Sequence, residues 1–407
     1  MQARRVWRAG GPGSGDAVTD AELATLTRLV LWLSFAVAVA FGAIAQRTRF
    51  CTMGAVADWV ATGDSTRMRM WAIAAGTAIV GFNAMVALGL VNAADSIYTG
   101  PRIVWLSALV GGLLFGVGMV LASGCTSKNL LRAGSGNLKA VVVLAMVAFA
   151  GFATLKGITA VLRVATVDGV FFAVDGTQDL PSILARATGA GPSVTAAFTG
   201  LLLGGALIGW ALSSREARAL EPMLGAAGLG LLVVAAWAIS GVLGHVAEHP
   251  QTLEAAFVGT NSRRMEALTF VSATAYTADY LMFFSDASKA LTIGIVSVVG
   301  LVVGAGAYSL ASRTFRWEGF ADVADLGRHL AGGLLMGVGG VTALGCTIGQ
   351  GISGVSTLSI TSVIALAAIL AGGYATVRFQ VWRIERADDV PPRRAVAKVV
   401  LSGMPRR

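Results

Sequence analysis

The stretch GGLLFGVGMVLASGCT at residues 111–126 nearly recurs as GGLLMGVGGVTALGCT at residues 332–347. The two copies agree at 12 of 16 positions, which is more than a shared apolar composition produces. Each copy is a glycine-rich apolar run that ends in Gly-Cys-Thr, so the pair holds two of the three cysteines in the chain. We therefore expect a duplicated fold in which the two copies occupy equivalent positions.

The composition of the whole chain is that of an integral membrane protein. Of its 407 residues, 55% are hydrophobic and 13% are charged, and the mean hydropathy is +0.73. Apolar runs of about 20 residues, enough for a helix to cross a hydrocarbon core of roughly 30 Å, recur along the chain. A membrane barrel would show short alternating strands instead. The sequence predicts an all-α integral membrane protein.

The apolar runs predict about nine transmembrane helices, at residues 28–46, 70–91, 104–123, 138–157, 193–212, 222–244, 290–312, 328–344 and 358–382. Four other segments are too short or too polar to span a bilayer, at residues 50–62, 125–136, 268–284 and 346–357. Non-helical backbone is tolerated inside a membrane only where protein or water surrounds it. We therefore expect these four segments to be re-entrant half-helices.

The predicted spans form two repeats around a single linking helix. Four spans precede this helix and four follow it, so the second copy enters the membrane in the opposite direction, an inverted-topology repeat found in many transporters. The expected organisation is a disordered N-terminal tail at 1–27, a first transmembrane repeat at 28–157, a connecting loop and linking transmembrane helix at 158–221, a second inverted repeat at 222–382 and a basic C-terminal tail at 383–407. The offset between the copies, from residue 111 to residue 332, also aligns Asp58 with Asp279 and Asn129 with Gln350.

The net charge of +9 is better explained by membrane topology than by nucleic-acid binding. The basic residues lie in loops and in the C-terminal tail, without a basic domain that would present them to a nucleic acid. With nine crossings, 20 of the 31 basic residues fall on the side that holds the C-terminus. The positive-inside rule then places the C-terminus in the cytoplasm and the N-terminus in the periplasm of a bacterial inner membrane. Arg4, Arg5 and Arg8 oppose this orientation.

The two Gly-Cys-Thr sites predict an anion site near the middle of the membrane. Polar, glycine-rich segments follow both of them, which predicts an unwound turn and then a half-helix. The free N–H groups at a helix N-terminus carry a partial positive charge that suits an anion. We expect the two half-helix termini to face one another across a pseudo-twofold axis. The residues of these sites are Gly124, Cys125 and Thr126 in the first copy and Gly345, Cys346 and Thr347 in the second.

The cysteines indicate which kind of anion these sites select. A thiol is a soft, polarizable and weak S–H donor, which favours a sulfur-bearing anion over sulfate or phosphate. The alternative is that buried cysteine serves as a small hydrophobe. The third cysteine, Cys51, follows Arg47 and Arg49, which either draw an anion to the cytoplasmic mouth or are plain positive-inside anchors. Lys128 either faces the pathway or snorkels to the surface.

The strings R-x-R-F-C at 47–51, GGLLFGVGMVLASGC at 111–125 and GGLLMGVGGVTALGC at 332–346 resemble the YeeE/YedE family of sulfur-transport membrane proteins, which includes bacterial thiosulfate importers. The resemblance implies nine spanning helices with short re-entrant ones. It also implies thiosulfate passing along a central path by hydrogen bonds with thiols, without a metal, nucleotide or other cofactor. Carried over by motif, these thiols are Cys51, Cys125 and Cys346. Importers of this type have a further cysteine early in the second repeat, where this chain offers Ser272 or a nearby Ser or Thr.

The sequence therefore predicts a permease, not an enzyme, that imports a small sulfur-containing anion, thiosulfate, through the lipid bilayer. The predicted substrate pathway comprises Cys51, Cys125, Cys346, Gly124, Thr126, Gly345, Thr347, Lys128 and Arg49, with no metal ligand. A cytoplasmic sulfur-carrier or rhodanese-like partner is implied by the resemblance alone.

Four alternatives remain open from the sequence. The first is a transporter of another sulfur or selenium species, and the second is a passive channel. The third is a membrane sulfurtransferase that carries a persulfide on Cys51. The fourth is a zinc site, because HVAEH at 245–249 matches the H-x-x-E-H pattern, although Pro250 follows it directly.

Overall fold

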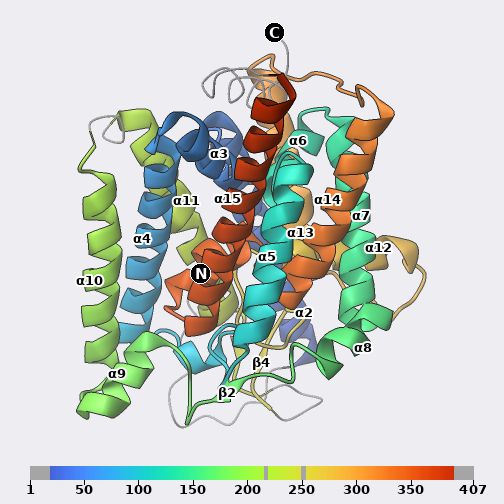
Figure 1. Cartoon of the computed structure of the whole chain (residues 1–407). Helices are drawn as coiled ribbons and strands as arrows, with labels where there is room; N and C mark the ends of the chain where they lie inside the picture. The colour runs from blue at the N-terminus through green and yellow to red at the C-terminus, as the bar shows by residue number, and fades with distance from the viewer. Residues whose placement is uncertain (1–18, 215–218, 249–253, 389–407) are drawn as a thin grey trace.

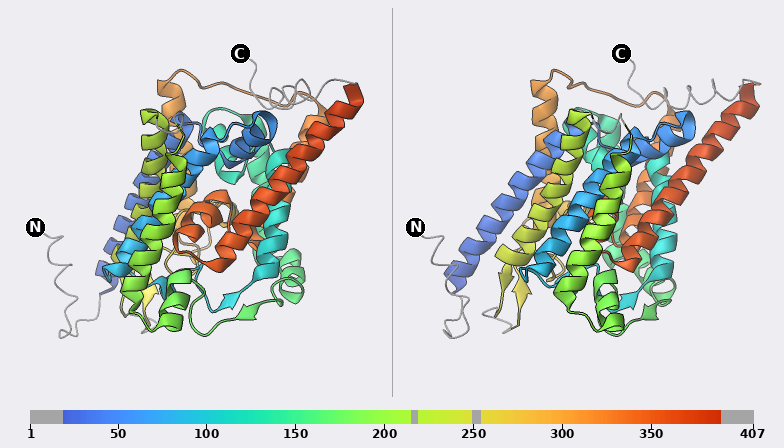
Figure 2. Two further views of the ribbon diagram at one scale, coloured as in Figure 1. Left: turned by 60° about the vertical axis from the view of Figure 1, so that its left-hand side comes forward. Right: turned by 90° about the vertical axis from the view of Figure 1, so that its left-hand side faces the viewer.

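The computed structural model describes residues 19–214, 219–248 and 254–388 as a bundle of long helices that run side by side (Figure 1, Figure 2). Within these residues, eight helical segments are long and apolar enough to cross a membrane. Short helices and two small strand pairs connect them. The prediction of an all-α membrane protein is confirmed.

The long helices, in chain order, are α2 (Asp20–Arg47), α4 (Thr66–Ala87), α5 (Trp105–Leu121), α7 (Leu138–Lys156), α10 (Pro192–Ala211), α11 (Leu220–Ala238), α13 (Ile293–Ala311), α14 (Val323–Thr342) and α15 (Ile360–Asp388). The shorter ones are α3 (Thr52–Thr62), α6 (Thr126–Gly134), α8 (Ile158–Ala165), α9 (Leu180–Thr188), α12 (Val271–Met282), the 3₁₀ turn η1 (Ala93–Asp95) and the π-helical turns η2 (Ile239–Leu243) and η3 (Gly349–Gly354). Strand β1 (Arg102–Ile103) pairs antiparallel with β2 (Phe172–Ala173), and β3 (His245–Val246) pairs antiparallel with β4 (Ala256–Phe257).

Helix α14 occupies the position of one of the nine expected spans, at 328–344, but it is more polar than the other long helices. Asp325, Arg328 and His329 lie in its first two turns and lower its hydropathy below that of a typical spanning helix. It nevertheless packs lengthwise against both α5 and α7 inside the bundle (Figure 1). The four segments predicted to be too short to span fold as α3, α6, α12 and η3.

The ends of the chain differ from the expected tail boundaries. Helix α2 begins at Asp20, before the expected start at residue 28, because Thr19 and Glu22 form a capping box. Helix α15 continues to Asp388, past the expected end at 382. The remaining tail residues, 1–18 and 389–407, lie outside the described residues.

The H-x-x-E-H stretch starts in an extended strand instead of a helix. His245 opens β3 and pairs with Phe257 of β4. A zinc site of this pattern needs its two histidines one helical turn apart on the same face. Residue 249 lies outside the described residues, and the described ones contain no cluster of three or more His, Cys, Asp or Glu side chains that could hold a metal.

Helices α5 and α14 cross in close contact through glycine, and the contacts repeat at the offset seen in the sequence. A Cβ atom on Gly111 would lie 2.5 Å from the backbone nitrogen of Ala343. A Cβ atom on Gly332 would lie 2.6 Å from the backbone nitrogen of Ala122. These two contacts are equivalent, because the offset between the copies aligns Gly111 with Gly332 and Ala122 with Ala343. The two helices are therefore antiparallel and related by a local twofold axis, as small-residue interfaces in membranes allow.

The helices around this central pair are also related by the local twofold axis. The contact of α5 with α15 in one copy corresponds to the contact of α14 with α7 in the other, and the contact of α2 with α13 corresponds to that of α11 with α4. The short elements show the same correspondence, because the contact of α6 with α13 matches the contact of η3 with α4. Figure 1 shows α3 and α6 near the upper end of the bundle, whereas β2 and β4 lie near the lower end. Helix α10 stands at the periphery beside α4.

We predict that Gly111→Ala lowers the free energy of unfolding by about 1–3 kcal/mol, the usual cost of overpacking. The added methyl group would meet backbone atoms of Ala343 and Gly339 at 2.5 and 2.7 Å, and backbone cannot move aside as a flexible side chain can. The matched control is Gly205→Ala on α10, where a Cβ meets nothing within 4 Å. Thermal melting of the purified protein in detergent measures the effect. Equal melting temperatures for the two variants would contradict the close crossing.

Candidate functional site

Each of the three cysteines stands immediately before a short helix or helical turn. The sulfur atoms of Cys51 and Cys346 each accept a hydrogen bond from the backbone N–H three residues further on, at 3.3 Å and 3.4 Å. Cys125 is the N-cap residue of α6, and its sulfur lies 3.2 Å from the Ser127 hydroxyl. The prediction that cysteine marks each helix break agrees with this placement.

The structure places the three free thiols near one another, because Cys125 lies within electrostatic range of both Cys51 and Cys346. Cys125 and Cys346 are 2% and 0% exposed, whereas Cys51 is partly exposed. We call Cys51, Cys125 and Cys346 the thiol row. It runs from a partly exposed end near α3 to a fully buried end near η3.

Both hairpins turn in the same way at the residue before the glycine. Ser123 has φ +55° and Leu344 has φ +59°, and these two positions are again equivalent in the two copies. A positive φ is costly for residues other than glycine. The strained residue follows the end of α5 and of α14, and Gly124 and Gly345 then carry the chain to the cysteines. The break predicted from the Gly-Cys-Thr strings is thus present in both copies.

Buried hydroxyls without hydrogen-bond partners lie next to the thiols. Thr126 and Thr347 are both 0% exposed, and neither side-chain oxygen has a partner of ordinary geometry. The Thr347 hydroxyl adjoins the sulfur of Cys125. Leaving a buried hydroxyl unpaired costs about 1–3 kcal/mol, so such groups usually mark a place for water or a ligand. The two threonines can therefore donate to an anion held between the hairpins.

Lys128 lies beside the thiol row. It belongs to α6, it is partly buried, and it is within electrostatic range of Cys51 and Cys125. Its side chain runs along Gly124, where a Cβ atom would be 3.0 Å from the lysine Cγ. These contacts place Lys128 near two of the thiols, and its place on the pathway stays a prediction.

Arg67 is a site residue that sequence reasoning missed. Its guanidinium pairs with Asp58 at 3.2 Å and lies across the start of α3, where a Cβ on Gly54 would be 2.5 Å from its Nη1 atom. The same ion pair occurs in the second repeat, where Asp279 binds Lys289 at 2.6 Å. The alignment of the two aspartates was visible in the sequence. The basic partners of the two aspartates did not align in the sequence, because the offset between the copies places Arg67 opposite Ser288 and not opposite Lys289.

Arg49 has φ +52°, it is exposed, and its side chain has no ion-pair partner among the described residues, so its place on the pathway stays a prediction. Arg47 binds Glu221 at 2.9 Å on the surface. Arg67 and Lys128 both lie near Cys51.

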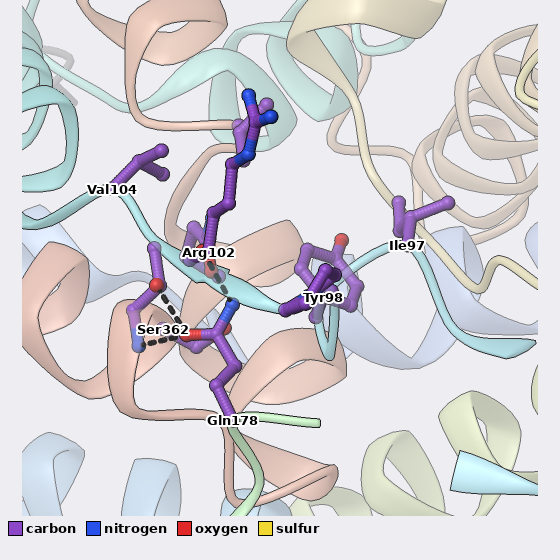
Figure 3. Close-up of a pocket in the computed structure, with 11 residues that line it drawn as sticks. Ile97, Tyr98, Arg102, Val104, Gln178 and Ser362 are labelled. Carbon is purple, nitrogen blue, oxygen red and sulfur yellow. Dashed lines mark hydrogen bonds between the residues drawn. The ribbon is translucent and has the colours of Figure 1, made fainter. Parts of the chain in front are cut away.

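A pocket of about 430 Å³ (Figure 3) is lined by Arg102 of β1, whose partner strand β2 lies near the lower end of the bundle in Figure 1. We call it the lower pocket. The exposed Arg102 lies at its rim, and Gln350 of the second hairpin lines its depth. Tyr98 and Ser362 also line it, and their buried hydroxyls have no partner of ordinary geometry. Gln178, from the loop that the sequence left without a role, completes the wall.

The hydroxyl of Thr269 lies beside Gly349, next to Cys346 in the second hairpin. Ser272 lies in the first turn of α12 and is partly exposed. Thr269 is 9% exposed, its hydroxyl is unpartnered, and a Cβ on Gly349 would lie 2.5 Å from that oxygen. Gly349 is the residue whose N–H donates to Cys346. Thr269 therefore occupies the position beside the buried end of the thiol row.

Comparison with known proteins identifies the family and several relatives of this chain. A family model described as sulphur transport matches residues 47–375, a range that contains all three cysteines. The thiosulfate transporter TsuA of Escherichia coli (strain K12) is 26% identical over 333 residues, which cover 76% of this chain and 83% of that protein. TsuA of Spirochaeta thermophila is 24% identical, with 85% and 97% covered. The probable transporter YedE of Escherichia coli is 31% identical over 34% of this chain and 32% of that protein.

We predict that a maleimide reagent modifies Cys51 at least tenfold faster than Cys125 or Cys346, because only Cys51 is partly exposed. Three variants that each retain one cysteine would be labelled in mild detergent, and the rates compared by mass spectrometry. Labelling in denaturant serves as the control and should be equally fast for all three. Modification of Cys346 in the native protein at the rate of Cys51 would contradict the buried row.

Proposed function

The chain belongs to the sulphur transport family, and from this membership and the thiol row we propose that it is an inner-membrane permease that imports a small sulfur-containing anion, thiosulfate. The observation that carries the proposal is the succession of three free thiols at helix breaks, one of them partly exposed and two buried. Two relatives that align over most of their length are named thiosulfate transporters.

The row suits an anion whose charge rests partly on sulfur. An anion that leaves water needs donors that replace its hydration, because burying an unpaired charge is very costly. Along the row these donors are thiol S–H groups, the Thr126 and Thr347 hydroxyls and free backbone N–H groups at half-helix starts. None of these donors carries a full charge. Each holds the anion weakly enough to pass it to the next.

Cations stand at the two ends of the path. Arg102 lies at the rim of the lower pocket, and Arg67 and Lys128 lie near Cys51. Basic groups at a pore mouth raise the local concentration of an anion. In the proposed orientation the lower pocket faces the periplasm and Cys51 faces the cytoplasm. The anion enters past Arg102, meets Cys346 and then Cys125, and leaves past Cys51 to a sulfur-carrier or rhodanese-like protein.

A second function is favoured by the exposure of Cys51. Arg67 and Lys128 lie near it and can draw an anion to this sulfur, which would be the nucleophile in sulfur transfer. The thiolate would attack the terminal sulfur of thiosulfate, forming a cysteine persulfide as the sulfur–sulfur bond of the anion breaks and sulfite leaves. This would make the protein a membrane sulfurtransferase. Mass spectrometry after exposure to thiosulfate distinguishes the two functions, because only the transferase gains the mass of one sulfur atom on Cys51 and releases sulfite.

We predict that Cys125→Ala and Cys346→Ala each reduce thiosulfate uptake roughly tenfold or more, since a hydrogen bond to a charged group is worth about 1.5–3 kcal/mol. Uptake of ³⁵S-thiosulfate into sealed vesicles measures the effect. Thr199→Ala, a buried polar change on peripheral α10, is the control and should transport normally. Normal uptake by all three single Cys→Ala variants would refute the thiol relay even if thiosulfate is the substrate.

We predict that Lys128→Ala lowers uptake severalfold, whereas Arg47→Ala leaves it unchanged. Lys128 adjoins two thiols, but Arg47 forms an exposed ion pair with Glu221 of the kind that contributes about 0–1 kcal/mol. Both variants remove one positive charge near the same end of the bundle, so net charge is controlled. Full activity of the Lys128 variant would place this lysine at the surface.

A further inference from the structure

Glu266 is a buried carboxyl group that the proposed anion path does not use. It lies in the segment between β4 and α12, and it is 8% exposed. No Lys, Arg or His side chain among the described residues forms an ion pair with it. A buried carboxylate without a cation is unstable, so the group either takes up a proton or acquires a partner.

The immediate surroundings of Glu266 are polar but uncharged. Its backbone N–H donates to the Ser240 hydroxyl at 2.9 Å, and the Ser262 hydroxyl lies 3.5 Å from its carboxylate. Arg264 points elsewhere and donates to the carbonyl of Ala94 at 2.7 Å, while Arg263 is exposed. Burial raises the pKa of Glu266 to about 7, against a smaller lowering by hydrogen bonds from Asn261 and Ser262.

The backbone holds Glu266 next to the lower pocket. Met265 accepts a hydrogen bond from Ile97 at 3.1 Å and donates one to Asp95 at 2.9 Å. The two segments run parallel with Met265 paired to Ser96, so Glu266 lies opposite Ile97, a residue that lines the lower pocket. Tyr98 lines the lower pocket, as Figure 3 shows, and its unpartnered hydroxyl points away from the backbone there.

Tyr98 connects the carboxyl group to the thiol row. It interacts electrostatically with both Glu266 and Cys346. Further along the segment of Glu266, the Phe270 backbone approaches the sulfur of Cys346. The titratable groups that face Glu266 are Tyr98, from the segment after η1, and Tyr276, from α12.

Arg102 lines the lower pocket, and the Arg264 guanidinium lies 3.8 Å from where a Cβ on Gly100 would be, but neither forms an ion pair with Glu266. An anion in the lower pocket would therefore lie near a carboxylate whose charge is not paired.

We propose that Glu266 is a proton-binding site that couples protonation to binding of the anion in the lower pocket, so that import depends on protons. The inference rests on the proposed function. The carboxylate takes up one proton from the aqueous side of the lower pocket, becomes a neutral carboxyl group and no longer repels the anion. Linkage is reciprocal, since protonation strengthens anion binding by the factor by which the anion strengthens proton binding.

The first repeat contains no equivalent group. Residue 45, which the offset between the copies places opposite Glu266, is a buried alanine. The proton site therefore exists at only one end of an otherwise twofold arrangement. This difference gives the two ends of the path distinct responses to pH.

The test compares uptake of ³⁵S-thiosulfate by proteoliposomes of the full chain at external pH 6 and pH 8. Wild-type uptake should fall roughly tenfold between these values, because Glu266 loses its proton across this range. Glu266→Gln imitates the neutral carboxyl group and should be equally active at both. Glu248→Gln removes an exposed carboxylate from the same end of the bundle and should keep the wild-type profile.

A binding measurement covers the case in which Glu266→Gln does not transport. Isothermal titration of the purified protein with thiosulfate should show wild-type affinity about tenfold weaker at pH 8 than at pH 6, and variant affinity equal at both. An unchanged pH profile in Glu266→Gln, in uptake or binding, would overturn the proton site and leave thiosulfate transport intact. Absence of wild-type uptake and binding at either pH would overturn the proposed function, and this inference with it.

Discussion

The close crossing of α5 and α14 is the constraint on which the rest of the structure depends. Gly111 meets the end of α14, and Gly332 meets the end of α5. The C-termini of the two helices are therefore offset by about three helical turns, or about 16 Å, well inside a hydrocarbon core of roughly 30 Å. Both helices stop within the membrane, and their hairpins bring the cysteines to the bundle interior.

The depth of these breaks explains why the donors along the row are neutral. Fully charged side chains are expensive in the middle of a membrane, whereas thiols, hydroxyls and backbone N–H groups are tolerated where protein surrounds them. Cys346, Thr126 and Thr347 are all 0% exposed, so water does not compete for their hydrogen bonds. The cations lie towards the ends of the row, where solvent can share the cost of their charge.

The sequence predicted the parts of this structure that local pattern and repetition determine. The all-α fold, the four short segments and the equivalent breaks at Cys125 and Cys346 follow from hydropathy and from the repeated strings. Arg67, Thr269 and the lower pocket depend on contacts between segments distant in the sequence, which one sequence does not reveal. Ser272 or a nearby Ser or Thr was expected to replace a thiol in the second repeat, and Thr269, which is one of these residues, lies beside Gly349, whose N–H donates to Cys346.

An inverted repeat gives the same geometry to both sides of a membrane, so direction has to come from single positions at which the copies differ. Lys128 aligns with Gly349, whose lack of a side chain lets Thr269 approach the buried thiol. The first hairpin therefore presents a cation where the second presents a hydroxyl. Ala45 and Glu266 differ in the same way, since only one end can bind a proton. A soft anion would meet a protonatable, hydroxyl-lined end first and a cationic end last, and this gradient follows from a few substitutions in a duplicated scaffold.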